Sequence, residues 1–239
     1  MDEKNGEGRV AVIAALRGEL KPLVKGWRHL RREGVDLWLG PPGGEDFLAA
    51  CAGVGAGAAE RAFVQAEKQG PLKAVVSAGW AGALDSPWVP GRAYLVSGVI
   101  DARGGKRYPA APTSLAGPEC WLVTSPRAAD QKEKRRLGWV HGAALVDMEA
   151  VTVARLAAER GIPFHCVKGV TDGWGERIPD FNLFLGADGS FRLGALAAYA
   201  LPRPASWPVL ARLGIHSDRA AHGVASLVKQ SFSSSFRVP

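Results

Sequence analysis

The stretch Ala144–Glu176 constrains the fold more than any other part of this chain. Apolar residues at helical spacing begin at Ala150, and Gly161-Ile162-Pro163 ends the predicted helix. A short apolar run, Pro163–Val170, follows and predicts a buried strand. A helix that leads directly into an apolar strand is typical of α/β layers. The stretch therefore predicts an α/β fold.

Two carboxylates in this stretch lie where open α/β sheets bind ligands. Glu149 opens the predicted helix, and Asp172 follows the end of the predicted strand. Each also has an ordinary structural explanation, because acids are favoured at helix starts and are common in loops. Together they offer two carboxylates to one substrate, for acid chemistry at a leaving group and for stabilising positive charge.

The residues around these carboxylates resemble the purine nucleoside phosphorylase and nucleosidase superfamily, most closely the methylthioadenosine/S-adenosylhomocysteine nucleosidases. The matching motifs are Met148-Glu149-Ala150 and Thr171-Asp172. The resemblance implies that Glu149 binds the ribose hydroxyls and that Met148 packs on the sugar. It also implies that Asp172 binds the base edge and protonates the leaving purine.

The resemblance implies one domain, residues 1–239, of the nucleoside phosphorylase type, with a mixed central sheet flanked by helices. The matches run in order over residues 10–185, between a polar tail (1–9) and a divergent C-terminal helical segment (186–239). Three short helices separated by proline and glycine are expected in that segment: Leu193–Leu201, Trp207–Leu213 and Arg219–Lys229.

Further matches supply more candidate residues. The buried strand Val10–Leu16 precedes Glu19, which by resemblance positions the attacking water; a helix-start acid is the alternative. The strand Lys73–Ser77 leads into a turn containing Gly79 and Trp80, which by resemblance lies at the floor of the site. Trp80 stands where the nucleosidases have a serine, and an apolar residue there is closer to the futalosine-hydrolase-like and hopanoid-associated branches; a core aromatic is the alternative.

Four positions complete the set. The glycine-rich loop around Gly55 precedes a helix and lets the backbone approach a ligand. Lys168 stands where the nucleosidases have an arginine, and it serves a hydroxide or a phosphate. Arg17 replaces a family acid and adds positive charge near any bound phosphate. Phe181 matches an aromatic over the 5′ side of the ligand, whereas the aromatic that stacks on adenine has no counterpart.

The resemblance implies cleavage of the N-glycosidic bond of a purine nucleoside, of the adenosine type and substituted at the 5′ carbon. No metal or organic cofactor is expected, and both hydrolysis and phosphorolysis, with phosphate as co-substrate, remain open. The superfamily implies a homo-oligomer. The alternative is a catalytically inactive nucleoside- or base-binding protein on the same fold.

The C-terminal segment resembles the tails of hopanoid-associated phosphorylases. A role in hopanoid side-chain synthesis is therefore a further expectation, together with peripheral membrane contact through the basic helix Arg219–Lys229. The alternative for this helix is ordinary amphipathic packing.

Net charge and cysteine content indicate which partners and which cellular compartment to expect. The net charge of +7 suits an anionic partner, but no nucleic-acid recognition pattern accompanies it, so no nucleic-acid partner is expected. The basic run Lys132–Arg136 is interpreted as the solvated face of a helix that begins near Ser125. Cys51, Cys120 and Cys166 indicate buried, reduced thiols. With a polar N-terminus and no long apolar run, they predict a cytoplasmic protein.

Overall fold

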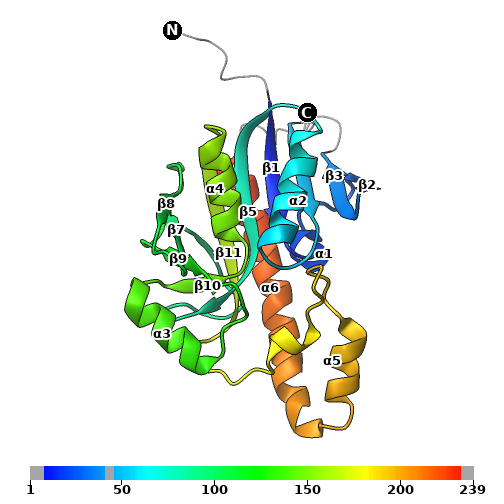
Figure 1. Cartoon of the computed structure of the whole chain (residues 1–239), viewed down its shortest axis with the longest axis vertical. Coiled ribbons are helices and arrows are strands. Elements are labelled where there is room, and N and C mark those ends of the chain that lie inside the picture. Colours follow the sequence, from blue (N-terminus) through cyan, green and yellow to red (C-terminus); the bar gives the residue numbers. More distant parts are fainter. Residues whose placement is uncertain (1–7, 41–45, 233–239) are drawn as a thin grey trace.

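The structure is a computed structural model that describes residues 8–40 and 46–232. These residues form one sheet of 11 strands in the order β2-β3-β4-β1-β5-β10-β9-β7-β8, with β11 paired to β5 and β6 (Figure 1). Parallel and antiparallel pairs both occur, so the predicted mixed α/β sheet is confirmed. The strands are β1 (Arg9–Ala14), β2 (Arg28–Arg32), β3 (Val35–Leu39), β4 (Phe47–Cys51), β5 (Leu72–Ala83), β6 (Ala93–Leu95), β7 (Gly98–Asp101), β8 (Arg107–Pro109), β9 (Trp121–Thr124), β10 (Leu145–Asp147) and β11 (Phe164–Asp172).

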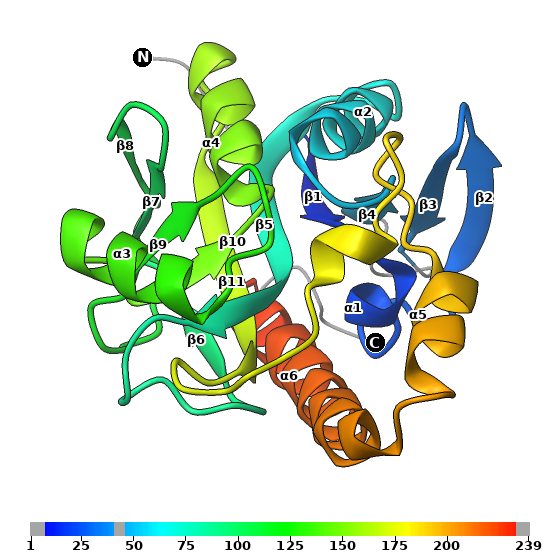
Figure 2. The same cartoon turned by 60° about the horizontal axis from the view of Figure 1, so that its bottom comes forward.

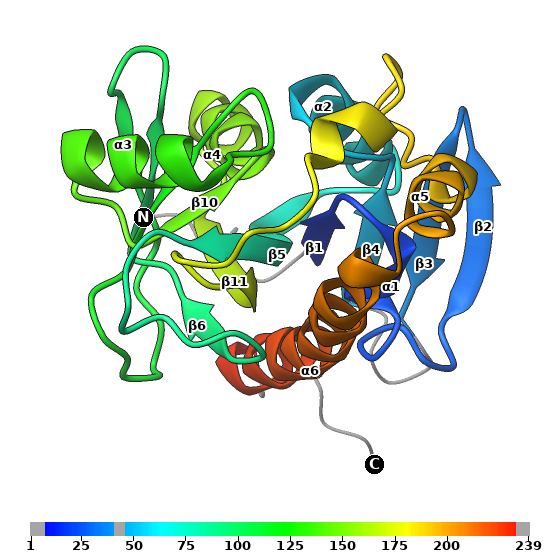
Figure 3. The same cartoon turned by 90° about the horizontal axis from the view of Figure 1, so that it is seen from below.

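Helices cover both faces of the sheet. Seen from below, α2 and α4 lie on one face, and α1 and α6 lie on the other (Figure 3). No helix among the described residues combines the length and the apolar character needed to cross a membrane. The helices are α1 (Arg17–Leu20), α2 (Ala56–Glu67), α3 (Gln131–His141), α4 (Ala150–Glu159), α5 (Leu193–Ala200) and α6 (Trp207–Ser231), with 3₁₀ turns η1 (Phe181–Phe184) and η2 (Pro204–Ser206).

The central strands are apolar on both faces, as strands between two helix layers require. On one face, Phe63 of α2 and Val153 of α4 belong to the larger core cluster. On the other face, Val224 and Val228 of α6 belong to a second cluster. The three thiols are buried and unbridged, as the sequence predicted, and burial raises the pKa of each to about 12.

Strand β5 positions the candidate site. Its first half lies between β1 and β11 and is parallel to both. Its far end pairs with β10 in antiparallel fashion, with Val146 opposite Gly82. Because β10 runs against β5, its last residue, Asp147, returns toward the end of β1. The predicted turn at Gly79 and Trp80 was wrong, since β11 pairs with β5 through both residues and β10 pairs with it just beyond them, so that β5 stays extended through Ala83.

Helix α6 is continuous where the sequence predicted two helices separated near Gly214. An internal glycine costs only about 1 kcal/mol relative to alanine, and packing of the later turns against the sheet offsets that cost. Ala220, Val224 and Val228 are buried there, so the apolar face of Arg219–Lys229 is turned toward the sheet. The ordinary packing alternative therefore describes this half of α6. Its first half extends below the sheet beside α5 (Figure 1).

The contact between α6 and β11 leads to a first prediction. A Cβ added at Gly169 would lie 2.7 Å from the Cβ of Ala220 and 2.9 Å from its carbonyl oxygen. We expect Gly169→Ala to destabilise the fold by about 1–3 kcal/mol because helix and strand must move apart. Urea unfolding measures this change. Gly175→Ala is the control, since its Cβ would meet nothing within 4 Å; equal stability of the two variants would contradict the packing argument.

Candidate active site

Lys168 lies in β11, which pairs with β5 and β6, and its side chain is almost completely enclosed. Its Nζ lies 2.8 Å from Oδ2 of Asp147, and the two side chains are 2% and 0% exposed. Asp147 also accepts hydrogen bonds from the Thr124 hydroxyl (2.6 Å) and from the Ala150 amide at the start of α4 (3.0 Å). Burial alone would lower the pKa of Lys168, but Asp147 and nearby acids raise it above its ordinary value. Lys168 is therefore held as an ammonium.

Glu19 approaches the same place from the end of β1. Its Oε2 accepts two backbone amides that follow β1 (2.8 and 2.7 Å), and its Oε1 accepts the amide of Trp80 (2.7 Å). A Cβ at Gly79, where φ is +140°, would lie 2.6 Å from Oε1, so only glycine allows this approach. Burial raises the pKa of Glu19, although the amides and Lys168 oppose the shift. A buried carboxylate with a raised pKa is suited to take a proton from water.

Glu149 connects the start of α4 to the start of α2. Its Oε1 accepts the amide of Gly55 (2.6 Å), and its Oε2 accepts the amide of Met148 at 3.3 Å. Burial, reinforced by the charge of Asp147, raises the pKa of Glu149 to about 8, while Lys168 acts in the opposite direction. A carboxylate has about four acceptor positions, so positions remain for ligand hydroxyls.

We call Glu19, Asp147 and Glu149, together with Lys168, the acidic cluster. Its members act on one another electrostatically: Glu19 and Asp147 raise the pKa of Glu149, and Lys168 lowers the pKa of both glutamates. The structure thus brings together Glu19, Glu149 and Lys168, which the sequence predicted as site residues. The cluster holds three acids and one ammonium.

A cavity of about 270 Å³ opens beside the cluster. Gly55, Met148 and Arg61 line it, together with the loop 185–189. This loop is fastened to the start of α2, because the Arg61 guanidinium donates to the carbonyl of Asp188 at 2.8 Å. Figure 2 shows η1 between α4 and α2, with the following chain running past α2. The volume is just below the usual range of about 300–1,000 Å³ for small-molecule sites.

Asp172 has a separate partner. It is the last residue of β11, and it forms a buried salt bridge with Lys134 of α3, whose side chain is 3% exposed. The Thr171 hydroxyl donates to Asp172 (2.7 Å), and Lys134 donates to the carbonyl of Gly173 (2.9 Å). Within the described residues, no hydrogen bond or ion pair joins Asp172 to the acidic cluster.

The interpretation of Lys132–Arg136 as a solvated face was wrong for Lys134. Helix α3 begins at Gln131, later than predicted, and Asp130 caps it by accepting the amide of Glu133 (2.8 Å). Lys134 then lies one turn before the buried Leu137, on the face that packs against the sheet. Sequence reasoning missed Lys134 and Asp147. Only Asp147 had a usable signal, an aspartate three residues before the helix starts.

Trp80 and Phe181 lie outside the cluster. The indole of Trp80 donates to the carbonyl of Ser217 in α6 (3.0 Å), so its side chain is on the α6 face of the sheet and only its amide reaches Glu19. This geometry favours the structural alternative for Trp80. Phe181 belongs to an aromatic group on η1 and the following loop, where its ring centroid lies 6.1 Å from that of Phe184 and 6.0 Å from that of Phe191.

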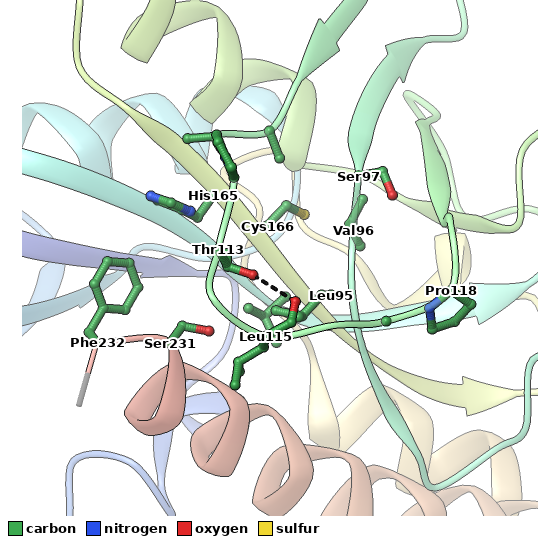
Figure 4. A pocket seen from close by; sticks show the side chains of 15 residues that line it. Leu95, Val96, Ser97, Thr113, Leu115, Pro118, His165, Cys166, Ser231 and Phe232 are labelled. Carbon is green, nitrogen blue, oxygen red and sulfur yellow. Dashed lines mark hydrogen bonds between the residues drawn. The ribbon is translucent and has the colours of Figure 1, made fainter.

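A second cavity, of about 290 Å³, lies between β6, the start of β11 and the end of α6 (Figure 4). Its polar side chains are Ser97, Thr113, His165 and Ser231, and no predicted site residue lines it. Burial lowers the pKa of His165. Unlike the first cavity, this cavity is not lined by residues that adjoin the acidic cluster, such as Gly55 and Met148. Within the described residues, no group of three or more His, Cys, Asp or Glu side chains is placed to hold a metal ion.

Part of the chain resembles a known protein family in sequence. Residues 120–192 match the sequence model of the phosphorylase superfamily. This segment contains Lys134, Asp147, Glu149, Lys168 and Asp172. No curated protein matches the chain by sequence.

Three solved structures illustrate the similarity of fold. One is 5′-methylthioadenosine/S-adenosylhomocysteine nucleosidase of Helicobacter pylori with butyl-thio-DADMe-Immucillin-A (TM-score 0.68, 12% identity, 96% of this chain and 99% of that chain covered). Another is futalosine hydrolase of the same organism (0.67, 12%, 95% and 98%). The third is 5′-methylthioadenosine nucleosidase of Arabidopsis thaliana (0.66, 18%, 94% and 96%). The resemblance to the superfamily is confirmed, and identities this low establish the fold alone.

The raised pKa of Glu149 leads to a second prediction. Its pKa is 4.5 in the unfolded chain and about 8 in the folded protein. Because the folded state binds this proton more tightly, the stabilisation is fully present below pH 4.5 and is lost as pH rises through about 8. Glu149→Gln keeps an oxygen for the Gly55 amide but cannot ionise.

We therefore expect the free energy of unfolding to fall less in Glu149→Gln than in the wild type between about pH 5 and about pH 9. Urea unfolding at both pH values measures the difference. The two proteins would show parallel pH dependence if Glu149 had an ordinary pKa.

Proposed function

We propose that this protein is an enzyme that hydrolyses the N-glycosidic bond of a purine nucleoside. The observation that carries the proposal is the placement of one ammonium, Lys168, among three carboxylates. A phosphate anion entering the acidic cluster would find no unpaired cation, because Lys168 is already paired with Asp147, whereas water needs none. The other cation considered for phosphate, Arg17, is engaged with Asp36 through two hydrogen bonds (2.8 and 2.6 Å). These charges favour water over phosphate as the nucleophile.

The acidic cluster supports a division of roles. Glu19 takes a proton from the attacking water, as its raised pKa favours. Glu149, beside Met148 and Gly55 at the cavity, accepts the ribose hydroxyls. Cleavage leaves positive charge on the sugar, and the carboxyl oxygens of the cluster stabilise it. This chemistry is related to glycoside hydrolysis by paired carboxylates and requires no metal or organic cofactor.

Asp172 acts on the leaving base. A purine that departs with the electron pair of the broken bond accepts a proton on its ring nitrogen. Asp172 stands at the carboxyl end of β11, where ligands bind in open α/β sheets. Asp172 lies four residues beyond Lys168 on the same strand. The carboxyl that would act on the base is therefore separate from the acidic cluster that would bind the sugar.

We propose that the substrate carries an apolar group at its 5′ carbon. Apolar side chains on η1 and on the chain that follows it could contact such a group. Phe181, Phe184 and Tyr199 pack on one another, and α5 follows them. We define the α5 surface as the exposed apolar side chains of α5 and of the chain after it: Leu193 (70% exposed), Leu201 (71%), Trp207 (53%) and Ile215 (52%).

The α5 surface also supports peripheral contact with an anionic membrane. Residues 189–217 contain no Asp or Glu, and Arg192, Arg203 and Arg212 are exposed there. Exposed apolar residues flanked only by basic charge suit the headgroup region of anionic lipids. This surface, rather than Arg219–Lys229, is where we place the membrane contact, and it agrees with a lipid-bearing substrate such as a hopanoid precursor. We retain one domain over 1–239 and a homo-oligomer as further proposals.

The activity is tested by base release from methylthioadenosine, adenosine and a 5′-lipidated adenosine, each with and without phosphate. We expect release that is independent of phosphate, and a loss of about 100-fold or more in kcat for Glu19→Gln because the base for water is removed. Strict phosphate dependence would contradict hydrolysis. Binding of adenine without release from any substrate would support the alternative of an inactive binding protein.

Membrane contact is tested by sedimentation with vesicles. We expect the protein to bind phosphatidylglycerol vesicles and not phosphatidylcholine vesicles, and binding to be lost in a Leu193→Ser, Leu201→Ser double variant. The control is Trp139→Ser with Val140→Ser, which removes exposed apolar side chains of α3 outside the α5 surface. Equal binding by both double variants would refute the location.

A further inference from the structure

A structural role alone does not explain why a lysine is buried at position 134. It comes from the basic run of α3, whose neighbours Lys132 and Arg135 are exposed, yet its own side chain is 3% exposed. A lysine ammonium has three protons to donate. Within the described residues, those donations go to the carboxylate of Asp172 and the carbonyl of Gly173.

Removing a lysine from water is costly unless a partner compensates, and hydrophobic residues usually serve such a position as well or better. Leu137, one turn along α3 from Lys134, belongs to an apolar core cluster with Leu84 and Val123. An apolar residue at position 134 with an uncharged one at 172 would pack in the same space. The pair is therefore better explained by a role of its charge.

The backbone is also adapted to this pair. A Cβ added at Gly82 would lie 3.0 Å from Cε of Lys134 and 3.2 Å from Oδ2 of Asp172. Glycine in β5 thus leaves room for the ammonium and the carboxylate to meet over the strand. Thr171 fixes the second oxygen, because its hydroxyl donates to Oδ1 of Asp172 at 2.7 Å. The carboxyl is held at both oxygens.

We infer that Lys134 is a positioning residue for Asp172, which holds its carboxyl toward the leaving base and resupplies the proton that Asp172 gives up. The inference rests on the proposed function, since it assumes that Asp172 serves the base. A lysine is suited to this work because it is both a hydrogen-bond donor and a source of a proton for the carboxylate.

Asp172 receives a proton from Lys134 and passes it to a ring nitrogen of the base, and the electron pair of the C1′–N bond leaves with the base. The oxygen of water forms the new bond to C1′, and its proton goes to Glu19. Solvent then takes the proton from Glu19 and returns one to Lys134. The net reaction is nucleoside plus water to free base plus sugar.

Two substrates separate this role from a structural one. A purine nucleoside needs a proton on its leaving group, whereas p-nitrophenyl riboside releases a stable phenolate that needs none. We expect Lys134→Met to lower kcat for the purine nucleoside by about 100-fold or more, the usual contribution of general acid catalysis. Turnover of p-nitrophenyl riboside should stay within about threefold of the wild type. Lys134→Arg should recover part of the purine activity, since it restores a charged donor that positions Asp172 but cannot supply a proton.

Two further variants keep the test decisive if Lys134→Met folds poorly. In an Asp172→Asn background, adding Lys134→Met removes both charges together, and we expect no further loss of purine turnover because Lys134 acts only through Asp172. Lys132→Met removes a lysine from the exposed face of the same helix and should behave like the wild type.

The outcomes distinguish the two proposals. An unchanged rate with the purine nucleoside in Lys134→Met would overturn the role of Lys134 and leave the proposed function intact. An equal loss with both substrates would show that Lys134 serves only the fold, and would overturn the inference as well. Failure of the wild type to cleave either substrate would instead overturn the proposed function.

Discussion

The buried pair of Lys168 and Asp147 is the interaction on which the geometry of the site depends. It ties β11 to β10 across β5, and Asp147 in turn holds the first amide of α4. Removing one partner of such a pair costs about 3–5 kcal/mol because a buried charge is left uncompensated. Glu19 and Glu149 also depend on it. Without the ammonium, both acids would face only each other and Asp147, and their carboxylate forms would be still less favourable.

The order of the strands explains how residues distant in sequence meet at this pair. Glu19 follows β1, Asp147 ends β10, and Lys168 lies within β11; β5 borders all three strands. The antiparallel pairing of β10 is decisive, since a parallel β10 would carry Asp147 away from the end of β1. Gly79 completes the arrangement by admitting Glu19 close to the strand. The three strands that border β5 thus bring one ammonium and three acidic side chains together.

The sequence predicted what depends on local pattern and missed what depends on tertiary contacts. The helix after Glu149, the strand before Asp172 and the carboxylates at their ends follow from spacing, so the α/β fold and most of the acidic cluster could be anticipated. Lys134 could not be anticipated, because the composition of a basic run does not show whether one of its lysines packs against the sheet. Continuity of α6 through Gly214 was missed for a related reason: burial of Val224 and Val228 outweighs a weak local preference.

The two lysine–carboxylate pairs near the end of β11 differ in the balance of charged groups around them. Around Lys168 the acids are in excess, whereas around Asp172 one carboxylate faces one ammonium. Breaking an N-glycosidic bond moves electrons from the sugar to the base. In the proposed reaction, the acids around Lys168 would stabilise the positive charge left on the sugar, and Lys134 would stabilise the negative charge that reaches the base. Because these groups are fixed in buried positions before a substrate arrives, the proposed reaction would require no reorganisation of them. The same two pairs that join α3 and α4 to the sheet would thus stabilise the charges that develop in the transition state.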